Sequence, residues 1–354
     1  MRPRIALIAA SLDIVGGQGI QARTLAKKLQ AEGFDLAFIP INPRFPSRLE
    51  WLRRWPYLRT FLNQALYLPS LRRLREADVI HILSAAYWSF LLAPAPAILA
   101  ARRYGKRVVL NYHSGEAEDH LERWGALVHP WLRMADEIVV PSDYLRRVFG
   151  RYGYQARVIR NIVDVSEFQC RERIPLRPHL FSNRNLESHY GVDNTLKAFS
   201  LVRKRFPDAT LTIAGYGSEE KSLRQLAETI GKEGIRFVGR VEPKAMAGLY
   251  GKADIFVNSS VIDNQPVSVL EAFASGLPVV STGTGDIANM VRDGENGVII
   301  PQRDPSAMAK AVVMLLENPE RARDIARRAR QEVRKYSWSE VGKEWAAVYS
   351  GREA

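Results

Sequence analysis

The sequence predicts an α/β protein built from two doubly wound, parallel-sheet domains. A length of 354 residues suits about two domains of roughly 150 residues each. Short β-rich runs alternate with longer helical patterns, which is typical of βαβ units. The runs are almost continuously apolar, as in strands that helices cover on both faces. With 46% apolar and 25% charged residues and one cysteine, Cys170, the composition excludes disordered and disulfide-framed chains and favours a cytoplasmic location.

The first alternating series fills the N-terminal half. The uncharged stretch 79–101 is long enough to span a bilayer. Pro94 and Pro96 lie inside it, however, so we predict a strand followed by a buried helix. For the apolar start we expect a buried first strand and not a leader peptide, because Asp13 and a glycine turn follow it instead of a cleavage site. The predicted strands are 5–10, 35–40, 79–83, 107–112, 137–141 and 157–159.

A second series follows a break in the periodicity. Charges, Pro175 and Pro178 crowd together over 164–178, which predicts a linker. The tail from Asp304 is helical, and Ser337-Trp338-Ser339-Glu340 gives a capping box for a last helix. The predicted strands of this half are 179–182, 210–215, 236–239, 254–258, 278–281 and 297–300. We expect domains over 1–163 and 179–336 and a C-terminal helix over 337–354.

The net charge of +13 lies in the N-terminal half, with 24 Lys and Arg against 13 Asp and Glu before Asn161 and 27 against 25 from there on. The segment Arg44–Arg75 holds eight arginines, no lysine and one acid, Glu50, among six aromatic residues. Such a segment can dock on the anionic inner face of a membrane and receive a lipid-linked acceptor. The alternative is a helical insertion whose aromatic side chains pack on the domain. No nucleic-acid-binding module is present, so we expect no nucleic-acid partner.

A glycine-rich turn follows the first predicted strand. It contains Gly16 and Gly17 and leads into a helix over 20–31. Glycines let the backbone approach an anion, and a helix N-terminus offers free amides. The spacing is neither that of a dinucleotide fingerprint nor that of a Walker loop. Phosphate contact and an ordinary tight turn therefore both stay open.

The second half holds a stronger constellation over 263–280. A strand ends at Asn258, a loop presents Asp263, and a helix opens near Val267 with its amides at the carboxyl end of the strand. Glu271 lies about one turn inside that helix. Carboxylates accept bonds from hydroxyls, and amides bind a diphosphate, so the pattern suits a sugar nucleotide. In the alternative interpretation, Asp263 caps the helix and Glu271 pairs with a surface arginine.

At this point the chain resembles the retaining glycosyltransferases of family 4, which have the GT-B fold. The resemblance covers nearly the whole length and implies two Rossmann-like domains facing a central cleft, with the C-terminal helix returning to the first domain. It rests on motifs in one fixed order: the Gly16-Gly17 turn, His113 after a strand, Asn161-Ile162-Val163-Asp164, Arg184 after a strand, Ala214-Gly215-Tyr216-Gly217, Phe237-Val238-Gly239-Arg240-Val241, and the run from Glu271 to Pro278.

The resemblance also implies roles for single residues. Glu271 matches the second glutamate of the family's E-x7-E motif and would bind the ribose hydroxyls, and Asp263 falls at the first glutamate, facing the donor sugar. His113 would lie beside the anomeric carbon. The remaining donor-binding residues implied are Arg184, Val267, Ser268, Gly16 and Gly17 at the diphosphate, Arg240 and Val241 beside the base, and Gly215. His113, Asp263 and Arg184 would carry the catalysis.

Three positions depart from the family's pattern. Asp263 is one methylene shorter than the usual glutamate. His189 stands where a lysine is common, and the loss of one fixed charge at a leaving group costs about 10²–10³ in rate if nothing replaces it. Asp286 replaces a glycine and adds a carboxylate near the expected site.

These observations predict a cytoplasmic retaining hexosyltransferase, peripheral on the inner membrane face. It would move a hexose from a nucleotide diphosphate sugar to a glycan or lipid-linked acceptor in surface polysaccharide or glycolipid biosynthesis. Two alternatives are a catalytically idle homologue that serves as a binding subunit, which the absent lysine motivates, and a sugar-nucleotide epimerase. His113, Glu116 and His120 lack the His-Glu-x-x-His spacing, so we predict no metal and no cofactor besides the donor.

Overall fold

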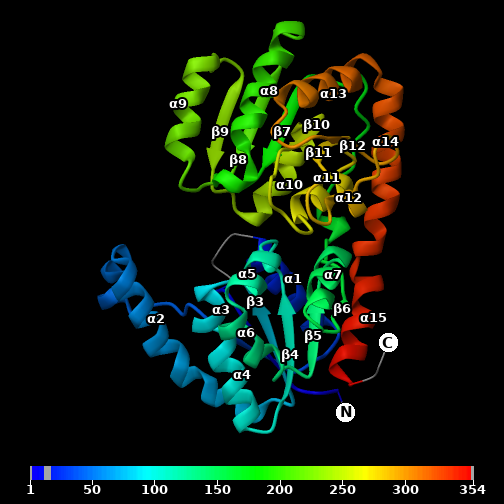
Figure 1. Cartoon of the computed structure of the whole chain (residues 1–354). Helices are drawn as coiled ribbons and strands as arrows, with labels where there is room; N and C mark the ends of the chain where they lie inside the picture. Colours follow the sequence, from blue (N-terminus) through cyan, green and yellow to red (C-terminus); the bar gives the residue numbers. More distant parts are fainter. Residues whose placement is uncertain (1, 12–16, 352–354) are drawn as a thin grey trace. The chain divides into compact units, whose positions relative to one another are not determined.

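The computed structural model describes residues 2–11 and 17–351. The chain forms two compact units. Unit 1 contains Met1–Arg160 and Val341–Ala354, and unit 2 contains Asn161–Glu340. In Figure 1 each unit is a twisted sheet with helices on both of its faces. This is the doubly wound arrangement that the alternating pattern predicts.

Unit 1 is built on a parallel sheet of order β2-β1-β3-β4-β5-β6. The central strands β3 and β4 are in register over six residue pairs, from Val79 beside Arg107 to Ser84 beside Tyr112. The strands are β1 (Ile5–Ala9), β2 (Leu36–Pro40), β3 (Val79–Ser84), β4 (Arg107–Tyr112), β5 (Glu137–Val140) and β6 (Arg157–Val158). The helices and 3₁₀ turns are α1 (Gly17–Ala31), η1 (Ser47–Arg54), α2 (Pro56–Ser70), η2 (Leu71–Glu76), α3 (Trp88–Leu92), α4 (Pro94–Arg103), α5 (Ala117–Arg123), α6 (Gly125–Leu132), α7 (Asp143–Arg151) and the end of α15 (Trp338–Tyr349).

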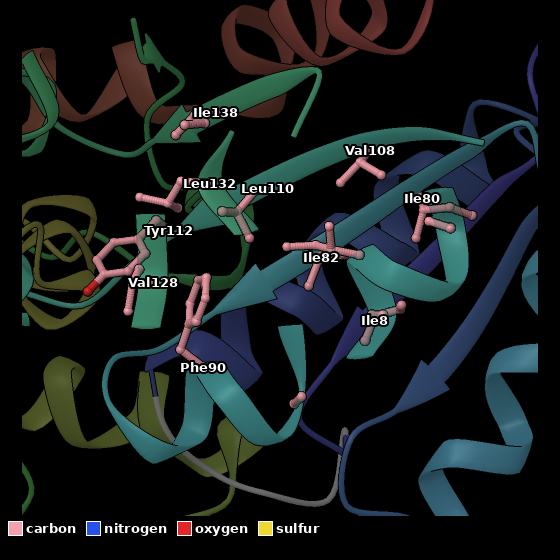
Figure 2. Close-up of a cluster of buried hydrophobic side chains, with 14 of the residues drawn as sticks. Ile8, Ile80, Ile82, Phe90, Val108, Leu110, Tyr112, Val128, Leu132 and Ile138 are labelled. Carbon is pink, nitrogen blue, oxygen red and sulfur yellow. The ribbon is translucent and has the colours of Figure 1, made fainter. Parts of the chain in front are cut away.

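The core of unit 1 lies between this sheet and its helices. Figure 2 shows Ile80 and Ile82 of β3 and Val108 and Leu110 of β4 directed into it, together with Phe90 of α3. All five side chains are fully buried. Because helices cover both faces of the sheet, strand residues that point to either face are apolar. This explains the continuous apolar runs in the sequence.

Helix α15 returns to unit 1 and covers a buried histidine. The hydroxyl of Tyr349 lies 2.8 Å from Nδ1 of His81, and the indole of Trp345 stacks on the imidazole at 4.6 Å. Burial lowers the pKa of His81 to about 3, so this ring is neutral at physiological pH. The last turns of the chain are therefore part of the core of unit 1.

Unit 2 repeats the architecture with a parallel sheet of order β12-β11-β10-β7-β8-β9. The strands are β7 (His179–Asn183), β8 (Thr210–Ala214), β9 (Ile235–Gly239), β10 (Ile255–Asn258), β11 (Val279–Thr282) and β12 (Val298–Ile300). The helices and 3₁₀ turns are η3 (Val165–Glu167), η4 (Ser188–Tyr190), α8 (Val192–Arg205), α9 (Glu220–Ile230), α10 (Pro243–Lys252), α11 (Val267–Ala274), α12 (Ile287–Met290), α13 (Pro305–Glu317), α14 (Pro319–Glu332) and η5 (Val333–Tyr336).

All twelve predicted strands are confirmed, each within about a residue at its ends. The uncharged stretch 79–101 forms β3, α3 and most of α4, as predicted. Within residues 2–11 and 17–351, none of the helices combines the length and the apolar character that a membrane span needs. The segment 164–178, which the sequence pattern suggests is a linker, instead belongs to unit 2 and packs against it through Arg171 and Arg173.

Candidate functional site

The carboxyl edge of the unit 2 sheet gathers the residues that the sequence singles out in this half. Arg184 follows β7, Gly215 follows β8, and Arg240 and Val241 follow β9. The loop after β10 carries Asp263 and leads into α11. Because β10, β7, β8 and β9 are neighbours in a parallel sheet, their carboxyl ends meet at one edge, where ligands bind in doubly wound folds.

Arg184 is the central cation of this edge. Its side chain is only 9% exposed and forms an ion pair with Asp263. It also donates a hydrogen bond of 3.0 Å to the hydroxyl of Ser268, and its guanidinium lies 4.2 Å from the ring centre of Tyr190. Its Nε is buried and has no hydrogen-bond partner within the described part of the chain. Arg184 therefore keeps one buried donor available for an anion.

Asp263 is held in place from both sides. Its carboxylate accepts a hydrogen bond of 3.0 Å from the amide of Asn264 as well as the bond from Arg184. On the other side, Gly285 has φ +57°, and a Cβ there would lie 2.0 Å from the carbonyl oxygen of Asp263. Only glycine fits this approach, so the loop that carries Gly285 fixes the backbone of Asp263.

Glu271 is a buried carboxylate, 7% exposed, on the second turn of α11. Its Oε2 lies 2.8 Å from the hydroxyl of Tyr250 and 3.4 Å from Nδ2 of Asn183. The Tyr250 hydroxyl also lies 3.0 Å from the carbonyl oxygen of Ser268. Burial raises the pKa of Glu271 to about 7, so both protonation states are populated near neutral pH.

The first turn of α11 lies next to both acidic residues. Pro266 is its N-cap residue and makes no side-chain cap bond to this turn. The amides of Val267 and Ser268 belong to the first turn, where a helix carries N–H groups without intrahelical partners. Val267 and Ser268 are 9% and 6% exposed. The partial positive charge of this helix end and Arg184 together suit a diphosphate.

Gly215 lets the end of β8 approach Arg184. Its φ is +146°, and a Cβ there would lie 2.0 Å from the carbonyl oxygen of Arg184. Arg240 extends from the end of β9, with its guanidinium 5.9 Å from the ring centre of Tyr216. Val241 is half-buried beside it. This part of the edge offers a guanidinium and an aromatic ring, groups on which a planar base can stack.

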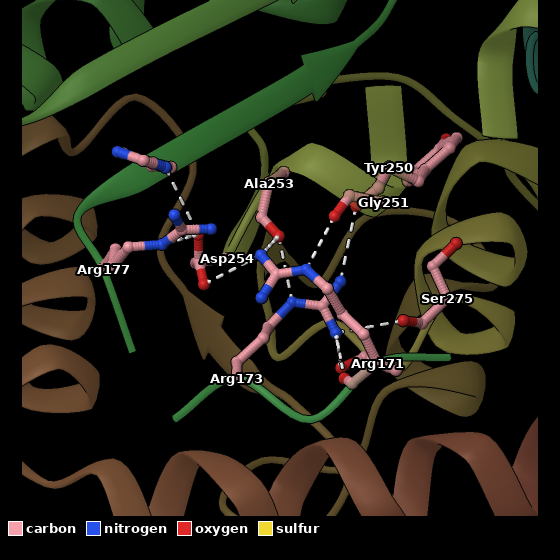
Figure 3. Close-up of polar contacts among 10 residues, drawn as sticks. Arg171, Arg173, Arg177, Tyr250, Gly251, Ala253, Asp254 and Ser275 are labelled. Carbon is pink, nitrogen blue, oxygen red and sulfur yellow. Dashed lines mark hydrogen bonds and ion pairs between the residues drawn. The ribbon is translucent and has the colours of Figure 1, made fainter. Parts of the chain in front are cut away.

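A buried arginine contacts α10 and α11 near their C-terminal ends (Figure 3). Arg173, 3% exposed, donates hydrogen bonds of 2.8 to 3.3 Å to carbonyl oxygens near the ends of both helices. Its neighbour Arg171 bonds the carbonyls of Gly251 and Ala253 and the carboxylate of Asp254. Tyr250 and Glu271 lie on these two helices. The arginine contacts therefore help to set the distance between them.

In unit 1, His113 follows β4 at the carboxyl edge of the sheet. It is half-buried, and its amide donates a hydrogen bond of 3.1 Å to the carbonyl of Ser84 at the end of β3. Burial lowers the pKa of His113 to about 4, so the ring is neutral at physiological pH. Gly17 is the first residue of α1, whereas Gly16 lies outside the described residues.

In the part of the chain that the structure describes, His113, Glu116 and His120 do not come together as a ligand set. His120 is fully buried, with Nδ1 2.8 Å from the hydroxyl of Tyr112 and its ring against those of Tyr87 and Phe90. Glu116 is exposed. Among the residues that the structure describes, no three His, Cys, Asp or Glu side chains converge as metal ligands do.

Two of the departures from the family's pattern have clear positions. His189 packs its ring 4.2 Å from that of Tyr190, which in turn lies under Arg184. Asp286 is 4% exposed, and its carboxylate accepts bonds of 3.2 Å from Gln265 and 2.7 Å from Asn289. The extra carboxylate thus bonds the loop before α11 and the helix α12.

Sequence reasoning missed Tyr250, Asn183 and Tyr190. Tyr250 lies in a helix without a recognisable motif, and only its burial on the inner face of α10 distinguishes it. Asn183 is the last residue of β7 and lies one residue after the predicted strand 179–182, so a polar residue next to a strand end is the available signal. Tyr190 follows His189 in the sequence, and no pattern there predicts its contact with Arg184.

Family models match both halves of the chain. Residues 15–167 match "Glycosyltransferase Family 4", and residues 172–332 match "Glycosyl transferases group 1". Among curated relatives, glycogen synthase of Mycobacterium tuberculosis is 31% identical over 288 residues, covering 77% of this chain and 68% of the relative. A phosphatidyl-myo-inositol mannosyltransferase of Mycobacterium leprae is 28% identical over 288 residues, covering 77% and 73%.

Solved structures share the fold over nearly the entire chain. Sucrose-phosphate synthase from Thermosynechococcus elongatus has a TM-score of 0.79 at 19% identity and covers 99% of both chains. Anabaena HepE, solved in complex with UDP and glucose, has a TM-score of 0.77 at 17% identity and covers 98% of this chain and 99% of that one. At these identities the likeness establishes the architecture.

Proposed function

Because the chain belongs to the glycosyltransferases with family 4 and group 1 domains, we propose that it transfers a hexose from a nucleotide diphosphate sugar to a glycan or lipid-linked acceptor, with retained configuration. The acceptor class follows the resemblance, and one relative is named for phosphatidyl-myo-inositol. The observation that carries the proposal is the cluster of Arg184, Asp263, Ser268 and Glu271 at one sheet edge, beside the first turn of α11.

Each part of a donor has a matching group in this cluster. Glu271 accepts hydrogen bonds from the vicinal hydroxyls of the ribose, since its second oxygen is not used by Tyr250 or Asn183. The diphosphate takes bonds from Arg184 and from the amides of Val267 and Ser268. Asp263 binds a hydroxyl of the donor sugar, and its shorter side chain brings that sugar closer to α11 than a glutamate would.

The transfer step needs no covalent intermediate with the enzyme. The bond between the anomeric carbon and the β-phosphate oxygen breaks, and its electron pair leaves with the diphosphate. The acceptor hydroxyl bonds to the same face of the anomeric carbon and gives its proton to a departing phosphate oxygen. Arg184 and the amides of α11 stabilise the charge that grows on the diphosphate, without a metal.

His113 acts as a neutral hydrogen-bonding group in this scheme. With a pKa lowered to about 4 it carries no charge at neutral pH, so it binds a sugar hydroxyl beside the anomeric carbon instead of a phosphate. Gly17, the first residue of α1, offers a main-chain amide to an anion.

The test is a screen of nucleotide sugars for slow donor hydrolysis and for transfer, with Glu271→Ala as the inactive comparison. Hydrolysis of one donor that Glu271→Ala abolishes is the expected result. Donor binding without turnover of any sugar, with or without acceptors, would instead identify an idle binding subunit. Interconversion of the nucleotide sugar with its epimer, and no transfer, would identify an epimerase.

A further inference from the structure

Helix α2 turns its apolar face to solvent. Tyr57, Phe61 and Leu68 recur at helical spacing and so lie on one face of α2, and they are 91%, 70% and 46% exposed. A surface helix ordinarily buries such a face against its own domain. Only Tyr67 of α2 is buried; its hydroxyl donates a 2.9 Å hydrogen bond to the carbonyl of Ala93. Figure 1 shows α2 as an arm that extends from unit 1.

The segment that leads into α2 enlarges this apolar surface. Trp51 of η1 and Trp55, the N-cap of α2, are each 60% exposed. Tryptophan and tyrosine are the side chains that concentrate at the boundary between water and a bilayer, because their rings are apolar at one end and polar at the other. Several large exposed apolar side chains within one short segment mark an interaction surface.

Arginines lie at both ends of the segment formed by η1 and α2. Arg48, Arg54 and Arg59 are exposed at its start, and Arg72 and Arg73 are exposed just after it, on η2. None of these five has an ion pair with an acidic side chain among the described residues. At 1.5 Å per residue, the apolar strip from Tyr57 to Leu68 is about 17 Å long, and the two groups of arginines lie near its two ends.

We propose that η1 and α2 form a docking surface for an anionic lipid bilayer. The aromatic side chains enter the headgroup region, and the flanking guanidinium groups bind lipid phosphates. A second copy of the chain is a poorer occupant, because pairing of two such faces would bring like-charged arginines together. The segment Arg44–Arg75 carries one acid against eight arginines, so its charge complements an anionic surface.

This proposal is independent of the donor site. All its residues lie in unit 1, on elements that carry none of the donor-binding residues proposed above. Donor binding by α2 variants therefore reports on the site in unit 2 and on folding, whereas lipid binding reports on η1 and α2. The two proposals can fail separately.

The experiment is co-sedimentation of the full chain with vesicles at low salt. Vesicles of phosphatidylglycerol and phosphatidylcholine in equal parts should carry the protein into the pellet, whereas vesicles of phosphatidylcholine alone should not. The charge reversal Arg54→Glu with Arg59→Glu, and separately Phe61→Ser with Leu68→Ser, should each lower the bound fraction by about tenfold or more. Unchanged melting temperatures would show that both variants fold.

Matched controls change the same groups elsewhere. Arg147→Glu with Arg328→Glu makes the same change in net charge on α7 and α14, and Leu99→Ser with Leu127→Ser removes leucines that are 52% and 54% exposed. Both controls should bind vesicles like the unmodified chain. Equal losses in the controls, or a chain that stays in the supernatant, would overturn the proposal.

The oligomeric state gives a further decisive outcome. The chain should have the same sedimentation coefficient as Phe61→Ser with Leu68→Ser in the absence of lipid. A dimer that this variant dissociates would assign the apolar face to a second copy and would overturn lipid docking.

Discussion

Glu271 is a site residue whose chemistry is strongly altered by its surroundings. Its carboxylate is 7% exposed, and burial raises its pKa from the ordinary value of 4.5 to about 7. The hydroxyl of Tyr250 and the amide of Asn183 favour the charged form but do not offset the loss of solvation. Hydroxyl groups of a ligand would add bonds to the carboxylate and shift it toward ionisation.

The raised pKa predicts a pH-dependent stability. Between about pH 4.5 and about pH 7 the folded state holds a proton on Glu271 that the unfolded state has released, so the free energy of unfolding falls as the pH rises through this window. The full effect is at most about 3 kcal/mol. Glu271→Gln should therefore be more stable, relative to the unmodified chain, at about pH 8 than at about pH 5 in urea denaturation.

The control for this measurement is Glu228→Gln, whose carboxylate is 62% exposed and pairs with Lys232. Its effect should be small and similar at both pH values, because an exposed pair contributes about 0–1 kcal/mol. An effect of Glu271→Gln that is the same at both pH values would show that Glu271 is ionised throughout the window.

At the scale of elements, α10 and α11 depend on the segment over 164–178. The charged residues and two prolines of this segment predict a linker. Arg173 is nevertheless buried because its partners are main-chain carbonyls, which a sequence pattern does not display. The strands, in contrast, were predictable because burial on both faces leaves a continuous apolar run that no other local structure of that length requires.

Arg173→Met should destabilise unit 2 strongly. The substitution removes the Arg173 donors to the carbonyls of Ser275 and Gly276 and one of the two donors to the carbonyl of Ala253, which Arg171 still bonds. We expect a loss of about 3 kcal/mol in the free energy of unfolding. Glu172→Gln changes the exposed neighbouring residue and should cost less than about 0.5 kcal/mol in the same denaturation experiment. Similar small effects of both substitutions would mean that the carbonyls find other donors.

At the scale of the whole molecule, the two units differ in how the chain builds them. Unit 2 is one continuous stretch, whereas unit 1 combines the first 160 residues with the end of the chain. Trp345 and Tyr349 of that end cover His81 in the core of unit 1. The alternation of apolar runs with helical patterns along the sequence sufficed to predict two similar α/β domains. The contacts of Asn183 and Tyr250 with Glu271 join positions that are well separated in the sequence and follow only from the fold.

This difference predicts the behaviour of fragments. The fragment 161–340 should fold alone, with a cooperative denaturation transition. The fragment 1–160 should be poorly folded, since it exposes the surface around His81 that α15 buries. In the full chain, Trp345→Ala should destabilise unit 1 by about 3–5 kcal/mol. Circular dichroism and proton NMR dispersion distinguish these states, and a fragment 1–160 as stable as unit 1 in the full chain would contradict the account.

The central claim is that Arg184, Glu271 and the first turn of α11 bind a nucleotide diphosphate sugar. Isothermal titration of the full chain with nucleoside diphosphates and their sugars tests it most directly. We predict that at least one of them binds and that Glu271→Ala and Arg184→Gln each weaken this binding by about tenfold or more, as the loss of a charge-assisted hydrogen bond implies. Equal affinities for the unmodified chain and both variants would contradict the account.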